Sequence, residues 1–225
     1  MSEKIIAQWW KKHTYLHNLK KVKESMTSEL TLTDMQDFSN MCAAIIQKCA
    51  SNGPGAGLSS GTLIDMLLCD FLKEKLDEYE QCHSGECDIK INNVPLSFKK
   101  INGKSTIALD WSKNLSSCIK KDKFTCCIII LNLKTEMWWK TNPKKLCKYN
   151  IKLKYNDTIP SGFYIIDKQF CKYYIKTTHN NKTNTLIEPN YLYQMLKRSA
   201  QLNLFVPVPP PNLIIKKFNI LHAFL

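Results

Sequence analysis

Apolar residues recur at the helical period through the first fifty residues of the chain. Over residues 3–25 they alternate with lysines, which predicts a basic amphipathic helix. A second apolar stripe extends from Thr33, a residue type that caps helices, to about Ala50. We expect the two helices to pack together as an N-terminal helical arm over residues 1–50. The apolar positions are Ile5, Ile6, Trp9, Trp10, Leu16, Leu19 and Val22 in the first helix and Met35, Phe38, Met41, Cys42, Ile45 and Ile46 in the second.

The helical pattern breaks at residues 51–61, SNGPGAGLSSG, which hold four glycines and one proline and predict a loop. A phosphate-binding loop is disfavoured here because no strand precedes the glycines and no Gly-Lys-Ser/Thr follows them. Over residues 62–79 the apolar residues again recur at helical spacing, with Asp65 and Asp70 among them. The predicted core positions of this third helix are Leu63, Ile64, Leu67, Leu68, Phe71, Leu72 and Leu76.

A β-hairpin is predicted next, with strands over residues 87–91 and 94–101. The two strands are joined by Asn92-Asn93, a pair that tolerates positive φ in a tight turn. Side chains alternate between the faces of a strand, so Ser97 and Lys99 share one face. We expect Lys99 to lie beside Asp88 across the hairpin.

The remaining pattern predicts further strands at residues 105–111, 124–133 and 162–167 and a helix at 189–199 that begins with proline. The run 124–133 is so apolar that it is expected at the centre of a sheet with both faces covered. The polar segment 178–185 predicts a loop, and the apolar tail 205–225 is expected to pack on the core or on a partner. The order of elements predicts an α/β protein of the α+β type, with a mixed central β-sheet flanked by helices.

The charge of the chain narrows the choice of partner. The 225 residues carry a formal net charge of +13, which favours a polyanionic partner such as nucleic acid or an anionic membrane surface. The basic residues are almost all lysines, with Arg198 as the single arginine. Lysine contacts guanine but lacks the planar fork of arginine. A basic surface without a specific partner remains the simpler alternative.

The ten cysteines are scattered over a chain long enough to fold without disulfides, so we expect buried thiols in a reducing compartment. Cys82, His83 and Cys87 are potential zinc ligands, but no second cluster of suitable spacing follows them, and free thiols are preferred. The N-terminal segment lacks the apolar core of a signal peptide, and no apolar stretch approaches the length of a membrane span. These features predict an intracellular, cytoplasmic protein with no membrane partner.

Three sequence segments, GAGLSSGTLIDMLLCDFL, GECDIKINNVPLSFKK and KSTIALDWSKN, lie between about residues 53 and 114. Together they resemble the core of the PD-(D/E)XK nuclease superfamily, as found in type II restriction endonucleases. Asp88 matches the first acid of that motif and Lys99 matches its lysine. Ser97 stands where the motif has a second acid, and a hydroxyl is a poorer Mg²⁺ ligand than a carboxylate.

The resemblance implies a restriction-endonuclease-like catalytic domain over residues 51–225 and Mg²⁺-dependent, site-specific cleavage of double-stranded DNA. Asp88 and the backbone carbonyl of Phe98 would bind Mg²⁺, with Asp65 or Glu86 in place of the missing acid. Lys99 would orient or deprotonate the attacking water, and Ser97 would hold a metal-bound water. For Asp65, an ordinary solvated helix acid is the alternative.

The same resemblance implies contacts to DNA, a homodimer suited to palindromic sites, and a companion DNA methyltransferase, in the cytoplasm of a bacterium or of a virus-infected host cell. Two alternatives stay open, namely a basic DNA- or RNA-binding protein without catalysis and a repair or recombination nuclease of the same fold. Aspartate and lysine on adjacent strands also form ordinary surface ion pairs. The residues expected to contact phosphates are Lys100, Lys104, Lys113 and Asn114, and those expected to reach base edges are Asn180, Asn181 and Lys182.

Overall fold

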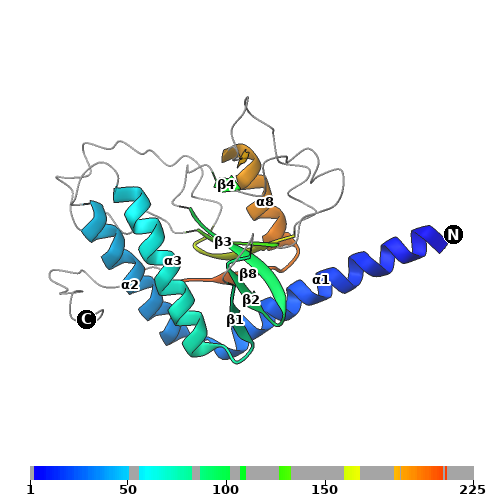
Figure 1. Cartoon of the computed structure of the whole chain (residues 1–225), viewed down its shortest axis with the longest axis horizontal. Coiled ribbons are helices and arrows are strands. Elements are labelled where there is room, and N and C mark those ends of the chain that lie inside the picture. Colours follow the sequence, from blue (N-terminus) through cyan, green and yellow to red (C-terminus); the bar gives the residue numbers. More distant parts are fainter. Residues whose placement is uncertain are drawn as a thin grey trace.

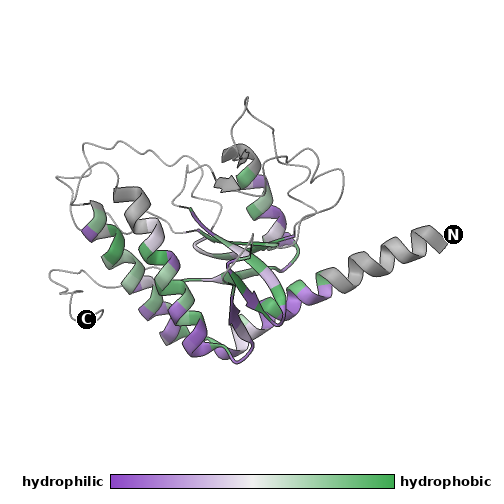
Figure 2. Cartoon of the chain, viewed as in Figure 1, coloured by the Kyte–Doolittle hydropathy of each residue, from purple (hydrophilic) through white to green (hydrophobic). Residues whose placement is uncertain are grey.

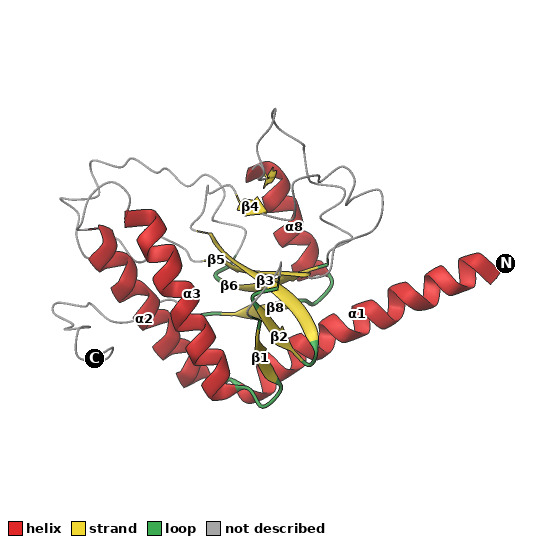
Figure 3. Ribbon diagram, viewed as in Figure 1, coloured by secondary structure: helices red, strands yellow, loops and turns green. Residues whose placement is uncertain are grey.

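The computed structural model describes residues 3–50, 56–82, 87–101, 107–109, 127–132, 160–167, 185–187, 189–209 and 211. Helices and strands follow one another along the chain as Figures 1 and 3 show. The helices are α1 (Glu3–Glu29), α2 (Leu32–Ala50), α3 (Ala56–Lys75) and α8 (Pro189–Gln201). The strands are β1 (Tyr79–Gln81), β2 (Ile89–Ile91), β3 (Val94–Ile101), β4 (Ile107–Leu109), β5 (Cys127–Asn132), β6 (Gly162–Ile166), β7 (Thr185–Ile187) and β8 (Phe205–Pro207).

The main sheet has six strands in the order β1-β2-β3-β5-β6-β8. Strands β3 and β5 pair in parallel, and all other neighbours in this sheet are antiparallel. Strands β4 and β7 form a separate antiparallel pair. The mixed sheet with helices packed on it confirms the predicted fold class.

Strand β5 lies at the centre of the sheet, as its apolar sequence predicts. Cys127, Ile129 and Leu131 belong to a core that α1, α2 and α3 share with one face of the sheet. Ile128 and Ile130 are also fully buried but lie outside that core. They point to the opposite face, where α8 packs on β6 through its own buried residues. The buried residues of α8 are Leu192, Met195 and Leu196.

Helix α1 confirms the first predicted helix and extends it to Glu29. Leu19, Val22 and Met26 are fully buried against the sheet and the other two helices, whereas the N-terminal part of α1 points away from the sheet in Figure 1. The side chains before Leu16 lie outside the described part of the chain. Because α1 and α2 share one core with the sheet, the division of the chain at residue 50 stays a prediction.

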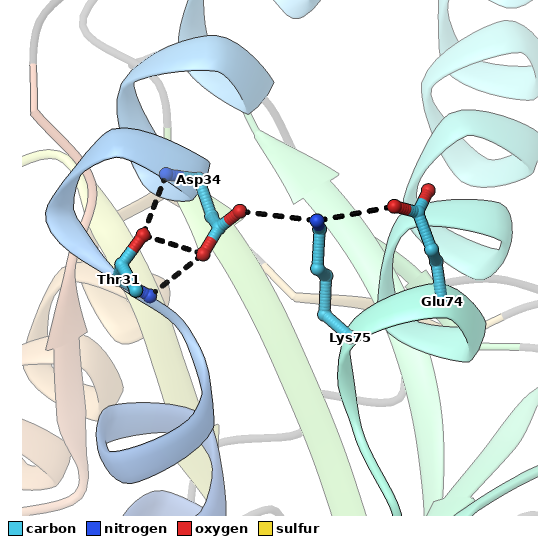
Figure 4. Close-up of polar contacts among 4 residues, drawn as sticks. All are labelled: Thr31, Asp34, Glu74 and Lys75. Atoms are coloured by element: carbon cyan, nitrogen blue, oxygen red, sulfur yellow. Dashed lines mark hydrogen bonds and ion pairs between the residues drawn. The ribbon is translucent and has the colours of Figure 1, made fainter.

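Helix α2 begins two residues earlier than a cap at Thr33 would place it, and Thr31 is its cap. The Thr31 hydroxyl accepts a hydrogen bond from the Asp34 N–H at 3.1 Å, while the Asp34 carboxylate accepts one from the Thr31 N–H at 2.9 Å. Lys75, at the end of α3, bridges Asp34 and Glu74 at 3.2 and 3.1 Å (Figure 4). This network joins the start of α2 to the end of α3.

Helix α3 begins at Ala56, inside the segment predicted as a loop, and ends before Tyr79, which starts β1. Most of its predicted core positions are buried, but Leu63 is 45% exposed, and so is Met41 of α2 at 42%. Both residues lie on helix faces that no described element covers. The apolar and polar faces of α2 and α3 are visible in Figure 2.

The predicted hairpin is confirmed as β2 and β3, with Ile91 opposite Val94. Asn92 and Asn93 join the strands at φ values of 51° and 60°, which asparagine tolerates better than most residues. The Asn92 side chain also donates a hydrogen bond to the Lys21 carbonyl of α1 at 3.3 Å. The turn is therefore fixed to α1 as well as to the sheet.

Candidate functional site

The site lies where β2 and β3 separate. Strand β2 begins at Ile89, which pairs with Leu96, whereas β3 continues to Ile101 along β5. From Ser97 onward, one edge of β3 is therefore no longer paired with β2. Asp88 immediately precedes β2 and lies at this open edge.

Two hydrogen bonds fix the Asp88 carboxylate. Its Oδ2 accepts the Phe98 N–H at 2.7 Å and the Ser97 hydroxyl at 3.1 Å. Its own N–H donates to the Leu96 carbonyl at 3.0 Å. Among the described residues, no hydrogen bond reaches Oδ1 of Asp88. One carboxylate oxygen is thus used for orientation, and the other is available to a ligand.

The residue opposite Asp88 is Ser97, not Lys99 as the sequence predicted, because the register pairs Ile89 with Leu96. Ser97 is 3% exposed and its hydroxyl is directed at Asp88. Its expected role in holding a metal-bound water stays a prediction. The described part of the chain contains no ion pair between Lys99 and Asp88, although both residues line one pocket.

That pocket, of about 370 Å³, lies between α3 and the open edge of β3. It brings together Asp65, Asp88 and Lys99, which are distant in sequence but were predicted to act together. Its full lining is Thr62, Asp65, Met66, Cys69, Asp70, Gln81, Cys82, Asp88, Phe98 and Lys99. Of these, Thr62, Met66, Cys69 and Gln81 carried no signal in the sequence, and Cys82 was considered only as a potential zinc ligand.

The environment of Asp65 raises the pKa of its carboxyl from 3.8 to about 6. Desolvation by the surrounding protein is the main cause, although the residue as a whole remains exposed at the pocket mouth. The charge of Lys99 lowers this pKa, that of Asp88 raises it, and that of Lys100 lowers it. Two acids and two lysines therefore lie close enough to affect one ionisation, and a cation between the acids would be stabilised.

Lys100 lies on the other face of β3 from Lys99 and is half-buried. Burial lowers the pKa of its ammonium. Nearby Cys42, Asp65 and Cys49 raise this pKa and so offset part of the shift. The side chain thus lies toward α2 and α3. Its expected contact with a DNA phosphate stays a prediction.

The structure corrects the expectation that the cysteines are all free thiols. Cys82 and Cys87 form a disulfide, with their Cα atoms 5.7 Å apart. The pattern Cys-x₄-Cys was visible in the sequence, but spacing alone does not distinguish a disulfide from two thiols. The described free cysteines are Cys42, Cys49, Cys69 and Cys127, and all but Cys69 are buried as expected.

Several predicted site residues lie outside the described residues: Glu86, Lys104, Lys113, Asn114, Asn180, Asn181 and Lys182. Within the ranges that the structure describes, no group of three or more His, Cys, Asp or Glu side chains converges on one point. The carboxylates that line the pocket are those of Asp65, Asp70 and Asp88, of which Asp65 and Asp88 were predicted as ligands. Magnesium is commonly held by one or two carboxylates and several waters, so this donor set fits that ion.

Phe98 adds a backbone group to this set. Its N–H points at Asp88, and in an extended strand the N–H and C=O of one residue lie on the same edge. The Phe98 carbonyl is therefore directed at the open edge of β3, as its predicted role as a metal ligand requires.

No family model matches the chain, and no curated protein matches its sequence. A solved structure described as "Restriction endonuclease in complex with substrate DNA" is similar to it, with a TM-score of 0.44 and 15% sequence identity over 72% of this chain and 79% of that chain. None of the helices in the described ranges is long and apolar enough to cross a bilayer.

Proposed function

We propose that the chain is a Mg²⁺-dependent, site-specific endonuclease that hydrolyses phosphodiester bonds of double-stranded DNA, in the manner of type II restriction enzymes. The observation that carries the proposal is the pocket at the open edge of β3, which contains Asp65, Asp88 and Lys99. Two acids and a lysine in one pocket are the groups needed to bind a divalent cation and to position a water beside a phosphate.

The two acids would hold the ion. Asp88 is already oriented by Ser97 and the Phe98 N–H, so its second oxygen binds a cation without further ordering of the side chain. The raised pKa of Asp65 reflects desolvation first and repulsion from Asp88 second, and a bound cation would offset both effects. When bound, Mg²⁺ lowers the pKa of a coordinated water and withdraws charge from phosphate oxygens.

Lys99 would act on the phosphate and on the attacking water. Its ammonium lines the same pocket and lowers the pKa of Asp65 through its charge, so it lies near the place where the scissile phosphate would bind. There it would orient the attacking water and stabilise the negative charge that develops on the phosphate oxygens. The net charge of +13 would draw the DNA backbone toward the protein. A homodimer would match the two-fold symmetry of palindromic sites, and a companion methyltransferase would protect the host DNA.

The experiment is incubation of supercoiled plasmid with the protein and Mg²⁺, followed by electrophoresis, with EDTA as the metal-free comparison. We expect discrete fragments with Mg²⁺ and intact plasmid with EDTA. Asp88→Asn and Lys99→Met should each abolish cutting, whereas Lys90→Met should not. Lys90 is a matched control because it lies on β2 in an ion pair with Glu80 outside the pocket. Full cutting by the Asp88 or the Lys99 variant would remove this site from consideration, and random nicking would indicate a repair nuclease.

A binding protein without catalysis is the second candidate, and one observation favours it. Ser97 stands where a carboxylate is expected, and its hydroxyl is already committed to Asp88, so β3 contributes no acid to the pocket. In a gel-shift assay this candidate predicts retarded DNA, with no cleavage at any Mg²⁺ concentration.

A further inference from the structure

We infer that the Cys82–Cys87 disulfide positions Asp88 at the pocket, so that the candidate site forms in the oxidised protein and is weakened when this bond is reduced. The inference rests on the proposed function, because it concerns the regulation of the same pocket. It assigns a role to two cysteines that the proposed chemistry does not use.

The disulfide lies directly beside the acid it would position. Cys87 is the residue before Asp88, and Cys82 lines the pocket that contains Asp88. The Cys82 N–H also donates a hydrogen bond to the Asp88 carbonyl at 3.0 Å. The covalent bond therefore closes the connection between β1 and β2 at the point where Asp88 enters the pocket.

Asp88 needs such a constraint because it lies outside the strand. Strand β2 begins only at Ile89, so Asp88 is held on its C-terminal side by the ladder and on its N-terminal side by the disulfide. Without the disulfide, the chain before Asp88 would gain the freedom of an ordinary loop, and ordering it would cost conformational entropy each time a metal bound. Reduction should therefore weaken metal binding while the sheet and its core remain folded.

The chemistry of the switch is ordinary thiol–disulfide exchange with a dithiol. One thiolate of the dithiol attacks a sulfur of the pair, the S–S bond breaks, and the departing cysteine sulfur takes a proton. The second thiol of the reductant then attacks the mixed disulfide, releases the other cysteine as a thiol and becomes part of a cyclic disulfide. Two electrons and two protons pass from the dithiol to the protein. Cys82 and Cys87 are half-buried, so a small dithiol can reach them.

Cys69 shares the pocket but does not compete in this exchange. Desolvation is the main cause that raises the pKa of its thiol, with the charges of Asp65 and Asp88 acting in the same direction. Its reactive thiolate form is therefore scarce. The other described free cysteines are buried.

The test compares protein oxidised with oxidised glutathione and protein reduced with dithiothreitol, and measures both plasmid cleavage and Mg²⁺ binding by calorimetry. We expect reduction to raise the Mg²⁺ concentration for half-maximal cleavage and the Mg²⁺ dissociation constant by about 10-fold or more, as loss of a group that positions a metal ligand does. Excess Mg²⁺ should restore most of the cleavage rate, and reoxidation should restore the affinity. A role confined to folding would not be rescued by Mg²⁺.

Two variants separate this disulfide from the other thiols. Cys82→Ser/Cys87→Ser should behave as the reduced protein and should not respond to dithiothreitol. Cys49→Ala, which removes a buried thiol remote from the pocket lining, should keep the full response. Alkylation before reduction should leave Cys82 and Cys87 unmodified in the oxidised protein.

The outcomes distinguish the inference from the function on which it rests. Equal Mg²⁺ affinity of the oxidised and reduced proteins would overturn the inference, whether or not DNA is cut. Alkylation of both cysteines in the oxidised protein would overturn it too. Absence of cleavage in both states, together with a redox-dependent Mg²⁺ affinity, would overturn the nuclease function and support the positioning of Asp88.

Discussion

The hairpin β2–β3 is closed at one end and open at the other, and the two ends use their polar side chains differently. At the closed end, Asn92 holds the turn by local conformation and by a hydrogen bond to α1. At the open end, Ser97 and the Phe98 N–H hold Asp88. The polar group of the closed end is used for stability, whereas Asp88 keeps one oxygen for a ligand. On this sheet, the carboxylate with an oxygen left for a ligand lies where the pairing of β2 with β3 ends.

The largest expected effect concerns the acid that α3 contributes to the open end. Asp65→Asn keeps the shape of the side chain but removes the charge that would bind a cation in the proposed site. We expect the cleavage rate at fixed Mg²⁺ to fall by about 100-fold or more, as loss of a group essential to catalysis commonly does. Asp77→Asn, beyond the end of α3 and outside the pocket, is the control and should cleave normally. An active Asp65 variant would show that Asp65 is an ordinary solvated acid.

A smaller loss is expected when the support of Asp88 is removed. Ser97→Ala deletes the hydroxyl that donates to Asp88 and leaves the Phe98 N–H as the remaining donor to Oδ2 among the described groups. A hydrogen bond to a charged group contributes about 1.5–3 kcal/mol, so the Mg²⁺ affinity should fall by about 10-fold or more. Ser97→Thr keeps the hydroxyl and should retain most of the affinity. Calorimetric titration with Mg²⁺ measures both, and an unchanged affinity in Ser97→Ala would contradict the assigned contact.

The closed end should respond in stability and not in activity. Asn92→Ala places a residue with poor tolerance of positive φ in the turn and removes the hydrogen bond to α1. We expect the free energy of unfolding to fall by about 1–2 kcal/mol, measured by urea denaturation, while the cleavage rate of folded protein is unchanged. Asn93→Gly, at the neighbouring positive φ, should be neutral or stabilising. A loss of cleavage in Asn92→Ala without a loss of stability would show that the two ends are not independent.

The pH dependence of stability should have opposite signs at Asp65 and Asp34. The pKa of Asp65 is raised in the folded protein, so the folded state loses stability as pH rises from 3.8 through about 6. Hydrogen bonds from Thr31 lower the pKa of Asp34 in the folded protein. The ionised Asp34 therefore stabilises the folded state above pH 3.8, and this stabilisation is lost as the pH falls through the lowered pKa. Above pH 6, Asp65→Asn should therefore unfold at a higher temperature than the native protein, and Asp34→Asn at a lower one. If the Asp65 variant were less stable than the native protein at that pH, the raised pKa assigned to the Asp65 carboxyl would be wrong.

The local parts of the fold could be predicted from the sequence. The Asn92-Asn93 turn and the run of apolar residues in β5 carry their own signals, because turn conformation and two-sided burial each select particular residue types. Short elements could not be predicted in this way. Strands β1 and β8 each have three residues, and β8 ends with a proline, so neither shows an alternation long enough to detect.

Three residues of the pocket could be predicted from the sequence to lie together, but their contacts could not. Asp88 and Lys99 match the motif, and Asp65 is an acid on the helix before the hairpin, yet the position of Ser97 opposite Asp88 depends on the register of the ladder. The sequence places the cap of α2 at Thr33 because threonine is a good cap at either position. The structure shows Thr31 as the cap, since Thr31 and Asp34 form reciprocal hydrogen bonds. The disulfide required knowledge of which cysteines meet in space.

Strand β5 is buried on both faces and paired on both edges, and this arrangement determines which part of the protein unfolds last. Its amide protons should exchange with deuterium only through global unfolding, because β3 and β6 protect both edges of β5. The Phe98 amide, whose acceptor is a side chain before the start of β2, should exchange through a smaller fluctuation. The protein can therefore lose the geometry around Asp88 transiently, many times, during the lifetime of one folded molecule.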